Sequence, residues 1–305
     1  MKKLIWLSLL SMLALSACQT QQTNKEETEG LHIYASIYPI QYIVEEIADE
    51  EANVESIYPP GVDAHTYEPS SKEITKLAKG DAFIYLGKEM ESFAETTADT
   101  LESQDITLLE IGQKDSLFET ETEDHDLDPH IWLDPLRMKK MGEMIKDKLI
   151  ELDPDQEATF EENYQAFQEE MESIDESFTD TLENKEQKDI LVSHAAYGYW
   201  EERYGIQQIA ISGLSSSDEP SQKELTEIAD IAKEKNIQYV IYEASTSNKT
   251  AEIIQDSIGA DKLSIHSLEV LTEEDIEKDR DYPSIMKDNL DVLDQATSKG
   301  GQSDA

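Results

Sequence analysis

The sequence predicts an α/β protein with two (β/α)4-like lobes, whose parallel sheets are joined by one long backbone helix. Three observations predict this fold. Short apolar runs alternate with helical patterns over residues 31–153, the same alternation returns over residues 187–296, and a single helical stripe fills the stretch between them. Strands that alternate with helices are typical of βαβ units and therefore of parallel sheets.

The first lobe, residues 31–153, contains four apolar runs that are typical of strands. They lie at residues 31–36, 53–58, 82–87 and 105–110, and helices are expected near residues 39–50, 70–79, 88–103 and 135–150. The helix near residues 70–79 has the clearest start. Ser70 and Glu73 have the spacing of a capping box, in which the serine side chain caps the helix and the glutamate reaches back to the serine.

The connection between the lobes, residues 154–186, is predicted to be one long helix. Apolar and aromatic residues recur there every three or four positions, at Phe160, Tyr164, Phe167, Met171, Ile174, Phe178 and Leu182. This spacing places them on one face of a helix. We interpret the stripe as packing against both lobes, and a rigid helical connection limits hinge motion between them.

The second lobe, residues 187–296, repeats the pattern of the first. Strands are predicted at residues 189–193, 207–212, 238–243 and 262–266, with helices near residues 195–204, 221–235 and 248–258. The polar residues 297–305 that follow are expected to be a disordered tail.

The first 30 residues predict export and a lipid anchor. Residues 1–17 have a basic start, an apolar stretch that is too short to span a bilayer, and small residues before Cys18, which is the layout of a signal peptide. Small residues before a lone cysteine resemble the bacterial lipobox, although an ordinary signal peptide with an incidental cysteine is the alternative. Residues 18–30 then form a lipidated cysteine and a flexible tether without apolar residues. The predicted location is extracytoplasmic, with the protein lipid-anchored to the cell membrane.

The charge of the chain excludes several classes of partner. It has 25 Lys and Arg against 68 Asp and Glu, a formal net charge of −43. Such a polyanion is repelled by nucleic acids and by anionic lipid head groups, so we expect no nucleic-acid partner and membrane contact through the lipid anchor only. Cations are favoured as ligands. The single cysteine excludes an internal disulfide and a cysteine-rich zinc site.

Three of the six histidines stand at junctions between strands and helices. His65 follows the second strand of the first lobe, His130 precedes the helix near residues 135–150, and His194 ends the first strand of the second lobe. Ligands of parallel sheets bind beyond the carboxyl ends of the strands, so these histidines can converge in the interlobe cleft. Neutral imidazoles suit Zn²⁺, and a site that stores an ion closes its tetrahedron with a fourth protein ligand.

Two glutamates compete for this fourth position. Glu269 follows the last strand of the second lobe and is the better placed, whereas Glu243 ends the strand at residues 238–243. A water molecule is the third alternative. Other carboxylates are expected to orient the imidazole rings, and Glu68 and Asp134 are the candidates for that role.

Several sequence motifs together carry a resemblance to a known protein family. They are His65-Thr66-Tyr67-Glu68-Pro69-Ser70, Asp128-Pro129-His130-Ile131-Trp132-Leu133-Asp134-Pro135, Val192-Ser193-His194-Ala195-Ala196-Tyr197, and Gly213-Leu214 with Glu219-Pro220-Ser221. Through these motifs the chain resembles the solute-binding lipoproteins of high-affinity metal ABC importers (cluster A-I), in the zinc-type, ZnuA/AdcA-like branch. The resemblance implies two lobes joined by a backbone helix, with a metal site in the interlobe cleft. It also implies that His65, His130 and His194 are metal ligands and that Glu269 can complete the site.

The resemblance implies capture and not catalysis. The transported ligand would be Zn²⁺, the partner would be the cognate membrane permease, and the protein would be a monomer. Manganese-type members of the family have a carboxylate at the position of His194, so this histidine favours zinc over the manganese-binding alternative. An extracellular zinc hydrolase is the competing class of protein, and an adhesin role in cell adhesion is a possible secondary function.

The chain departs from the family pattern before the Asp-Pro-His motif. Many zinc-type members have a long His-rich loop there, whereas residues 119–128 are short and acidic and contain only His125. We interpret this loop as a solvated segment. His32 and His266 match no ligand position, and we expect both to be structural.

Overall fold

The computed structural model describes residues 30–298, except for residues 88–89, 92, 119–126, 216–217, 219 and 245–248. The predicted signal peptide, Cys18 and the tether up to residue 29 lie outside the described residues, as do most of the acidic loop and residues 299–305 of the predicted tail. In the part of the chain that is described, no helix has the length and apolar character needed to cross a membrane.

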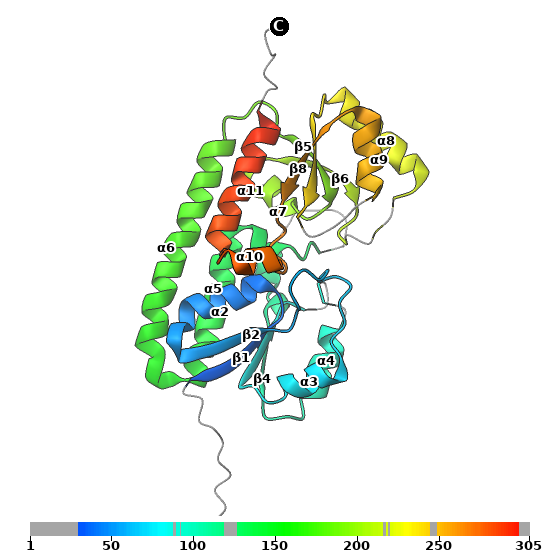
Figure 1. Ribbon diagram of the computed structural model, residues 1–305. Helices are drawn as coiled ribbons and strands as arrows, with labels where there is room; N and C mark the ends of the chain where they lie inside the picture. Colours follow the sequence, from blue (N-terminus) through cyan, green and yellow to red (C-terminus); the bar gives the residue numbers. More distant parts are fainter. Residues whose placement is uncertain are drawn as a thin grey trace, which may run out of the picture.

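The first lobe is a four-stranded parallel sheet with the strand order β2-β1-β3-β4 (Figure 1). Its strands are β1 (Leu31–Ala35), β2 (Ala52–Ser56), β3 (Ala82–Tyr85) and β4 (Thr107–Glu110), and its helices are α2 (Tyr38–Ala48), α3 (Ser71–Leu77) and α4 (Ala94–Leu101). The predicted capping box is present, because the Ser70 side chain accepts the backbone N–H of Glu73 and the Glu73 carboxylate accepts that of Ser70. All four predicted strands are confirmed.

Helix α4 begins six residues later than the predicted helix near residues 88–103. Gly87 has a φ of +132°, a conformation that glycine adopts without a steric penalty. The Glu91 carboxylate then accepts the backbone N–H of Gly87 at 2.7 Å, and this glutamate is fully buried. The described residues 90, 91 and 93 before α4 are not helical, although the residue composition alone favours a helix there.

One long helix, α6 (Glu157–Leu182), connects the lobes. Helix α5 (Pro135–Leu152) leads through a short 3-10 turn into α6, which runs along both lobes on one side of the molecule (Figure 1). The predicted stripe is confirmed, with Phe160, Phe167 and Met171 among its buried members. The two helices approach closely at Gly142, where a Cβ atom would lie 2.7 Å from the Phe167 ring.

The second lobe is also a four-stranded parallel sheet, with the order β6-β5-β7-β8. Its strands are β5 (Asp189–His194), β6 (Gln207–Ser212), β7 (Tyr239–Glu243) and β8 (Asp261–Ile265), and its helices are α7 (Gly198–Tyr204), α8 (Gln222–Glu234), α9 (Lys249–Ile258), α10 (Glu273–Glu277) and α11 (Tyr282–Thr297). Helix α11 returns along α6, and its last residue, Thr297, is buried. One large core contains apolar residues of both lobes and of α6, and a smaller core lies between the second sheet and helices α8 and α9.

Candidate metal centre

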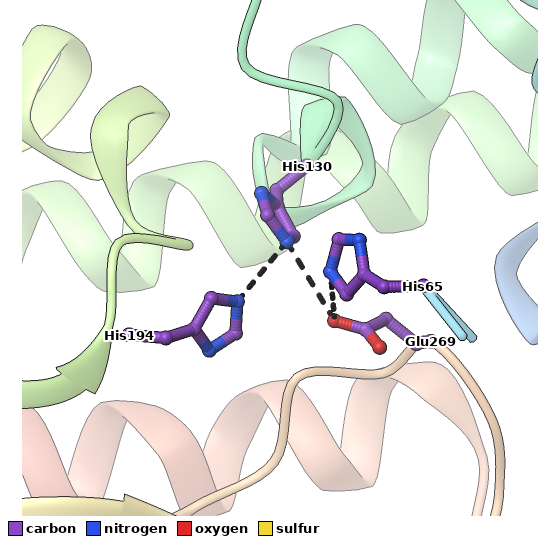
Figure 2. Close-up of side chains that lie close together, drawn as sticks. All are labelled: His65, His130, His194 and Glu269. Atoms are coloured by element: carbon purple, nitrogen blue, oxygen red, sulfur yellow. Dashed lines mark hydrogen bonds and ion pairs between the residues drawn. The ribbon is translucent and has the colours of Figure 1, made fainter. Parts of the chain in front are cut away.

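The carboxyl ends of the two sheets face each other, and four side chains meet between them. His65 comes from the loop between β2 and α3, His130 from the segment before α5, His194 from the end of β5 and Glu269 from the segment after β8 (Figure 2). Each offers one ligand atom, and these four atoms all lie within 4.8 Å of one another. His65, His130 and His194 therefore lie together with Glu269, the fourth residue that the family resemblance implies.

The distances within this group suit a small tetrahedral ion. His130 Nε2 lies 3.3 Å from His194 Nε2 and 3.6 Å from Glu269 Oε1, and His65 Nε2 lies 3.7 Å from the same carboxylate oxygen. Ligand atoms arranged tetrahedrally at about 2.0–2.2 Å from Zn²⁺ would be about 3.3–3.6 Å apart. These three distances match that spacing, and the remaining ones are at most 4.8 Å, so the four atoms would need to move inward to coordinate one ion.

The group is shielded from water. The side chains of His130 and His194 are 0% and 1% exposed, whereas those of His65 and Glu269 retain 8% and 10%. His65 Nε2 and Glu269 Oε1 are buried and have no hydrogen-bond partner among the described residues. A buried polar atom without a partner costs about 1–3 kcal/mol, and a bound cation would satisfy both atoms.

His130 is held by its own loop. Asp128 Oδ1 accepts the backbone N–H of His130 at 2.9 Å and lies 2.7 Å from its Nδ1, so Nε2 points into the group. Burial opposes a positive charge on this ring, but the carboxylates of Asp128 and Glu269 outweigh burial and raise the pKa of His130 to about 10. Trp132 Nε1 also donates to the Ser267 carbonyl, which connects this loop to the segment that carries Glu269.

His194 ends the central strand β5 and is contacted from behind by Glu243. Its Nδ1 lies 2.5 Å from Glu243 Oε1, at the end of the neighbouring strand β7, while its Nε2 faces His130. Glu243 is thus on the outer side of the imidazole ring. Of the two glutamates that the sequence left open, Glu269 lies in the group of four and Glu243 does not.

His65 lies on an irregular loop that main-chain contacts hold in place. Its backbone N–H donates to Asp63 Oδ1 at 2.9 Å, and the hydroxyl of Tyr58 donates to the Ala64 carbonyl. The N–H of Gly61 donates to the Leu271 carbonyl in the second lobe, so the loop spans the cleft. Burial is the main cause that lowers the pKa of His65, which favours the neutral imidazole.

Glu269 lies in a tightly bent segment after β8. Leu268 has a φ of +63°, a left-handed conformation that is unfavourable for leucine. The N–H of Leu268 donates to His266 Nδ1, and the Glu269 carbonyl accepts the N–H of Tyr38. Burial alone would raise the pKa of the Glu269 carboxyl, but the three histidines outweigh it and lower the pKa to about 2. This residue therefore supplies an anionic oxygen at neutral pH.

The two remaining described histidines make contacts outside the group of four. His266 accepts the N–H of Leu268, and its Nε2 lies 3.1 Å from Asp275. His32 lies on the far side of the first lobe, where its Nε2 lies 3.0 Å from Glu55, and about a third of its side chain is exposed. Neither belongs to the group of four.

The carboxylates predicted to orient the rings do not do so. Glu68 is exposed, and Asp134 caps α5 and accepts two hydrogen bonds, at 2.8 and 2.7 Å, from Arg203 of the second lobe. Asp128 and Glu243 occupy the positions behind the rings instead. The position of Asp128 two residues before His130 was a usable sequence signal, but the Glu243 contact depends on which strand lies beside β5.

The fold and the site together define a two-lobed α/β binding protein, in which a long helix joins the lobes and a buried His₃Glu group lies between them. The chain belongs to the ZnuA family, described as the zinc-uptake complex component A, periplasmic, which matches residues 33–296.

Relatives and solved structures agree with this assignment. The chain is 34% identical over 315 residues to the zinc-binding lipoprotein AdcA of Streptococcus pneumoniae, which covers 99% of this chain and 62% of AdcA. The chain thus spans less than two thirds of that relative. The crystal structure of the Zn(II)-bound ZnuA-like domain of the same AdcA matches with a TM-score of 0.75 at 33% identity, covering 88% of this chain and 100% of the domain.

A second solved structure extends the comparison. The laminin-binding protein Lmb of Streptococcus agalactiae matches with a TM-score of 0.76 at 27% identity, over 88% of this chain and 100% of Lmb. Lmb is described as a bifunctional protein with adhesin and metal-transporting activity.

Proposed function

We propose that this chain is an extracytoplasmic solute-binding protein that captures Zn²⁺ and delivers it to the membrane permease of an ABC transporter for zinc uptake. The observation that carries the proposal is the group of four ligand atoms, which lie within 4.8 Å of one another between the lobes. Family membership and the zinc-bound relative support the same function.

In this proposal His65, His130, His194 and Glu269 are the ligands. Three imidazole nitrogens and one carboxylate form a borderline-soft donor set, which suits Zn²⁺ better than the harder Mn²⁺. Nε2 of His65 and Oε1 of Glu269 support the assignment, because both atoms are buried, have no hydrogen-bond partner among the described residues and face the other ligands (Figure 2). A manganese-binding member of the same family is the alternative that a competition experiment tests.

The proposed role is capture, not hydrolysis. A catalytic zinc site keeps one position open for water and needs a general base beside it. Here Glu269 Oε1 lies within 3.7 Å of two histidine nitrogens, where it would fill the fourth position itself. The family is described as an uptake component, which agrees with this interpretation.

We further propose that Cys18 carries a lipid and that the tether up to residue 30 holds a monomeric protein at the outer face of the cell membrane. The cysteine and the polar composition of the tether support this, and the AdcA relative is itself described as a lipoprotein. An adhesin role remains a prediction, for which the description of Lmb is the support.

Metal analysis of the purified protein tests the proposed function. We expect one tightly bound zinc per chain. When Zn²⁺ and a large excess of Mn²⁺ compete for the metal-stripped protein, zinc should occupy the site. Preferential binding of manganese would overturn the zinc assignment. A protein that holds no stoichiometric metal would overturn the function altogether.

A further inference from the structure

Glu243 is a buried carboxylate that the proposed ligand set does not use. The residue is 5% exposed, and its Oε1 lies 2.5 Å from Nδ1 of His194. The opposite nitrogen of the same ring, Nε2, lies 3.3 Å from His130 Nε2 inside the group of four. The imidazole of His194 therefore stands between a carboxylate on one side and the ion position on the other.

The sheet itself builds this contact. Strands β5 and β7 are parallel neighbours, with Val192 opposite Ile241. Two residues further along each strand, on the same face of the sheet, are His194 and Glu243. Their juxtaposition is thus fixed by backbone pairing in the middle of the sheet and does not depend on a loop.

A carboxylate in this position decides which nitrogen of the histidine can bind a metal. A neutral imidazole carries its proton on one nitrogen and a lone pair on the other, and the hydrogen bond of one nitrogen sets the role of the second. An acceptor beside Nδ1 stabilises the form with Nδ1–H and a free lone pair on Nε2. His130 shows the same arrangement with Asp128 beside its Nδ1.

We propose that Glu243 is a positioning residue of the metal centre, which accepts the Nδ1 proton of His194 and so holds the Nε2 lone pair toward the ion. This inference rests on the proposed function, because it assigns a role within that site. Each lobe would then hold one histidine ligand through a carboxylate beside its Nδ1, with Asp128 beside His130 and Glu243 beside His194.

Removing the charge of Glu243 should weaken the metal site without deleting a ligand. Loss of such a carboxylate partner typically costs 10–100-fold in metal affinity. We therefore expect Glu243→Gln to bind zinc 10–100-fold more weakly than the wild-type protein in a chelator competition titration. The matched control is Glu91→Gln, which neutralises a buried glutamate of the other lobe that contacts backbone N–H groups and should keep wild-type affinity within about threefold.

The outcomes separate this inference from the proposed function. If the wild-type protein holds no zinc, the proposed function fails. If the wild type binds zinc and Glu243→Gln binds it within threefold of the wild type, the function stands and the role of Glu243 is overturned. A loss of the same size in Glu91→Gln would also overturn it, because any buried carboxylate would then have the same effect.

A second measurement does not depend on the variant folding. ¹⁵N-histidine NMR of the zinc-loaded wild-type protein reports which ring nitrogen of each histidine carries a proton. We expect His194 to bind zinc through Nε2 and to keep a slowly exchanging proton on Nδ1. Coordination through Nδ1, or an Nδ1 proton that exchanges as fast as in a solvent-exposed imidazole, would overturn the proposal.

Discussion

Two buried glutamates at the carboxyl edges of the two sheets show opposite acid–base behaviour. Glu91, in the first lobe, is buried and accepts backbone N–H groups, and burial is the main cause that raises its pKa to about 7. Glu269, in the second lobe, is also buried, yet its pKa falls to about 2. The difference lies in the neighbours, because three imidazole rings surround Glu269.

This comparison shows how the fold prepares a site for a cation. Burial alone drives a carboxyl group toward its neutral form, which is a poor metal ligand. The histidines that would share the ion also keep Glu269 anionic before the ion arrives. The converging rings and the carboxylate therefore form one electrostatic unit.

Deleting a central ring should have the largest effect. His130 contacts both His194 and Glu269, so His130→Ala removes a ligand and the main cause that lowers the pKa of Glu269. A structural zinc site is worth about 10–16 kcal/mol, so one of four ligands contributes about 2.5–4 kcal/mol, or roughly a hundredfold or more in affinity. Chelator competition measures this loss.

His32→Ala is the control for that experiment. Its ring pairs with Glu55 at the far side of the first lobe, and the variant should keep wild-type zinc affinity. A His130→Ala protein that binds zinc as tightly as His32→Ala does would refute the ligand assignment.

Glu91→Gln should change how stability depends on pH. The carboxyl of Glu91 stays protonated up to about pH 7 in the folded protein, whereas in the unfolded chain it releases its proton near the ordinary glutamate pKa of 4.5. The wild type therefore loses stability as pH rises from about 4.5 to about 7, by up to about 3 kcal/mol. The glutamine variant lacks this loss.

Urea unfolding of the metal-free proteins at pH 4.5 and pH 8 measures the effect. The free energy of unfolding of Glu91→Gln, relative to the wild type, should increase by about 2–3 kcal/mol between the two values. An unchanged difference would show that neighbouring amide dipoles already stabilise the charged form of Glu91.

The smallest expected effect, about tenfold in zinc affinity for each unit of pH, comes from the proton released when zinc binds. His130 has a pKa of about 10 in the metal-free protein, so one proton must leave at neutral pH, while Glu269 with a pKa of about 2 is already charged. Zinc affinity should therefore fall by about tenfold for each unit of pH lowered between about pH 9 and pH 7. Calorimetry in buffers of different ionisation enthalpy counts the protons, and a count of zero would contradict the prediction.

Local patterns were sufficient to predict much of this structure. The eight strands and the long helix α6 follow from periodicity. The convergence of His65, His130 and His194 follows from their positions at junctions of strands and helices, whereas the addition of Glu269 to the group depended on the resemblance to a known family. The sequence could not predict which side chains from distant segments would contact each other. Glu243 lies 49 positions after His194 and meets it only because β7 lies beside β5 in the sheet.

The other differences have a similar origin. The helix expected near residues 88–103 begins at Ala94, and the Glu91 carboxylate before it accepts the backbone N–H of Gly87, a contact that helix propensity does not report. Asp134 accepts a hydrogen bond from Arg203 of the other lobe and does not contact the imidazole rings. Each case is a long-range or loop-specific contact that outweighs a local preference.

The core that the two lobes share along α6 determines how cooperatively the protein unfolds. Apolar residues of both lobes, of α5, α6 and α11 belong to one continuous cluster, so neither lobe has this core to itself. Thermal unfolding is then expected to be a single cooperative transition, in which the lobes lose their structure together. A ligand bound in the cleft, present at 100 times its dissociation constant, would stabilise the entire chain by about 2.7 kcal/mol, even far from the cleft.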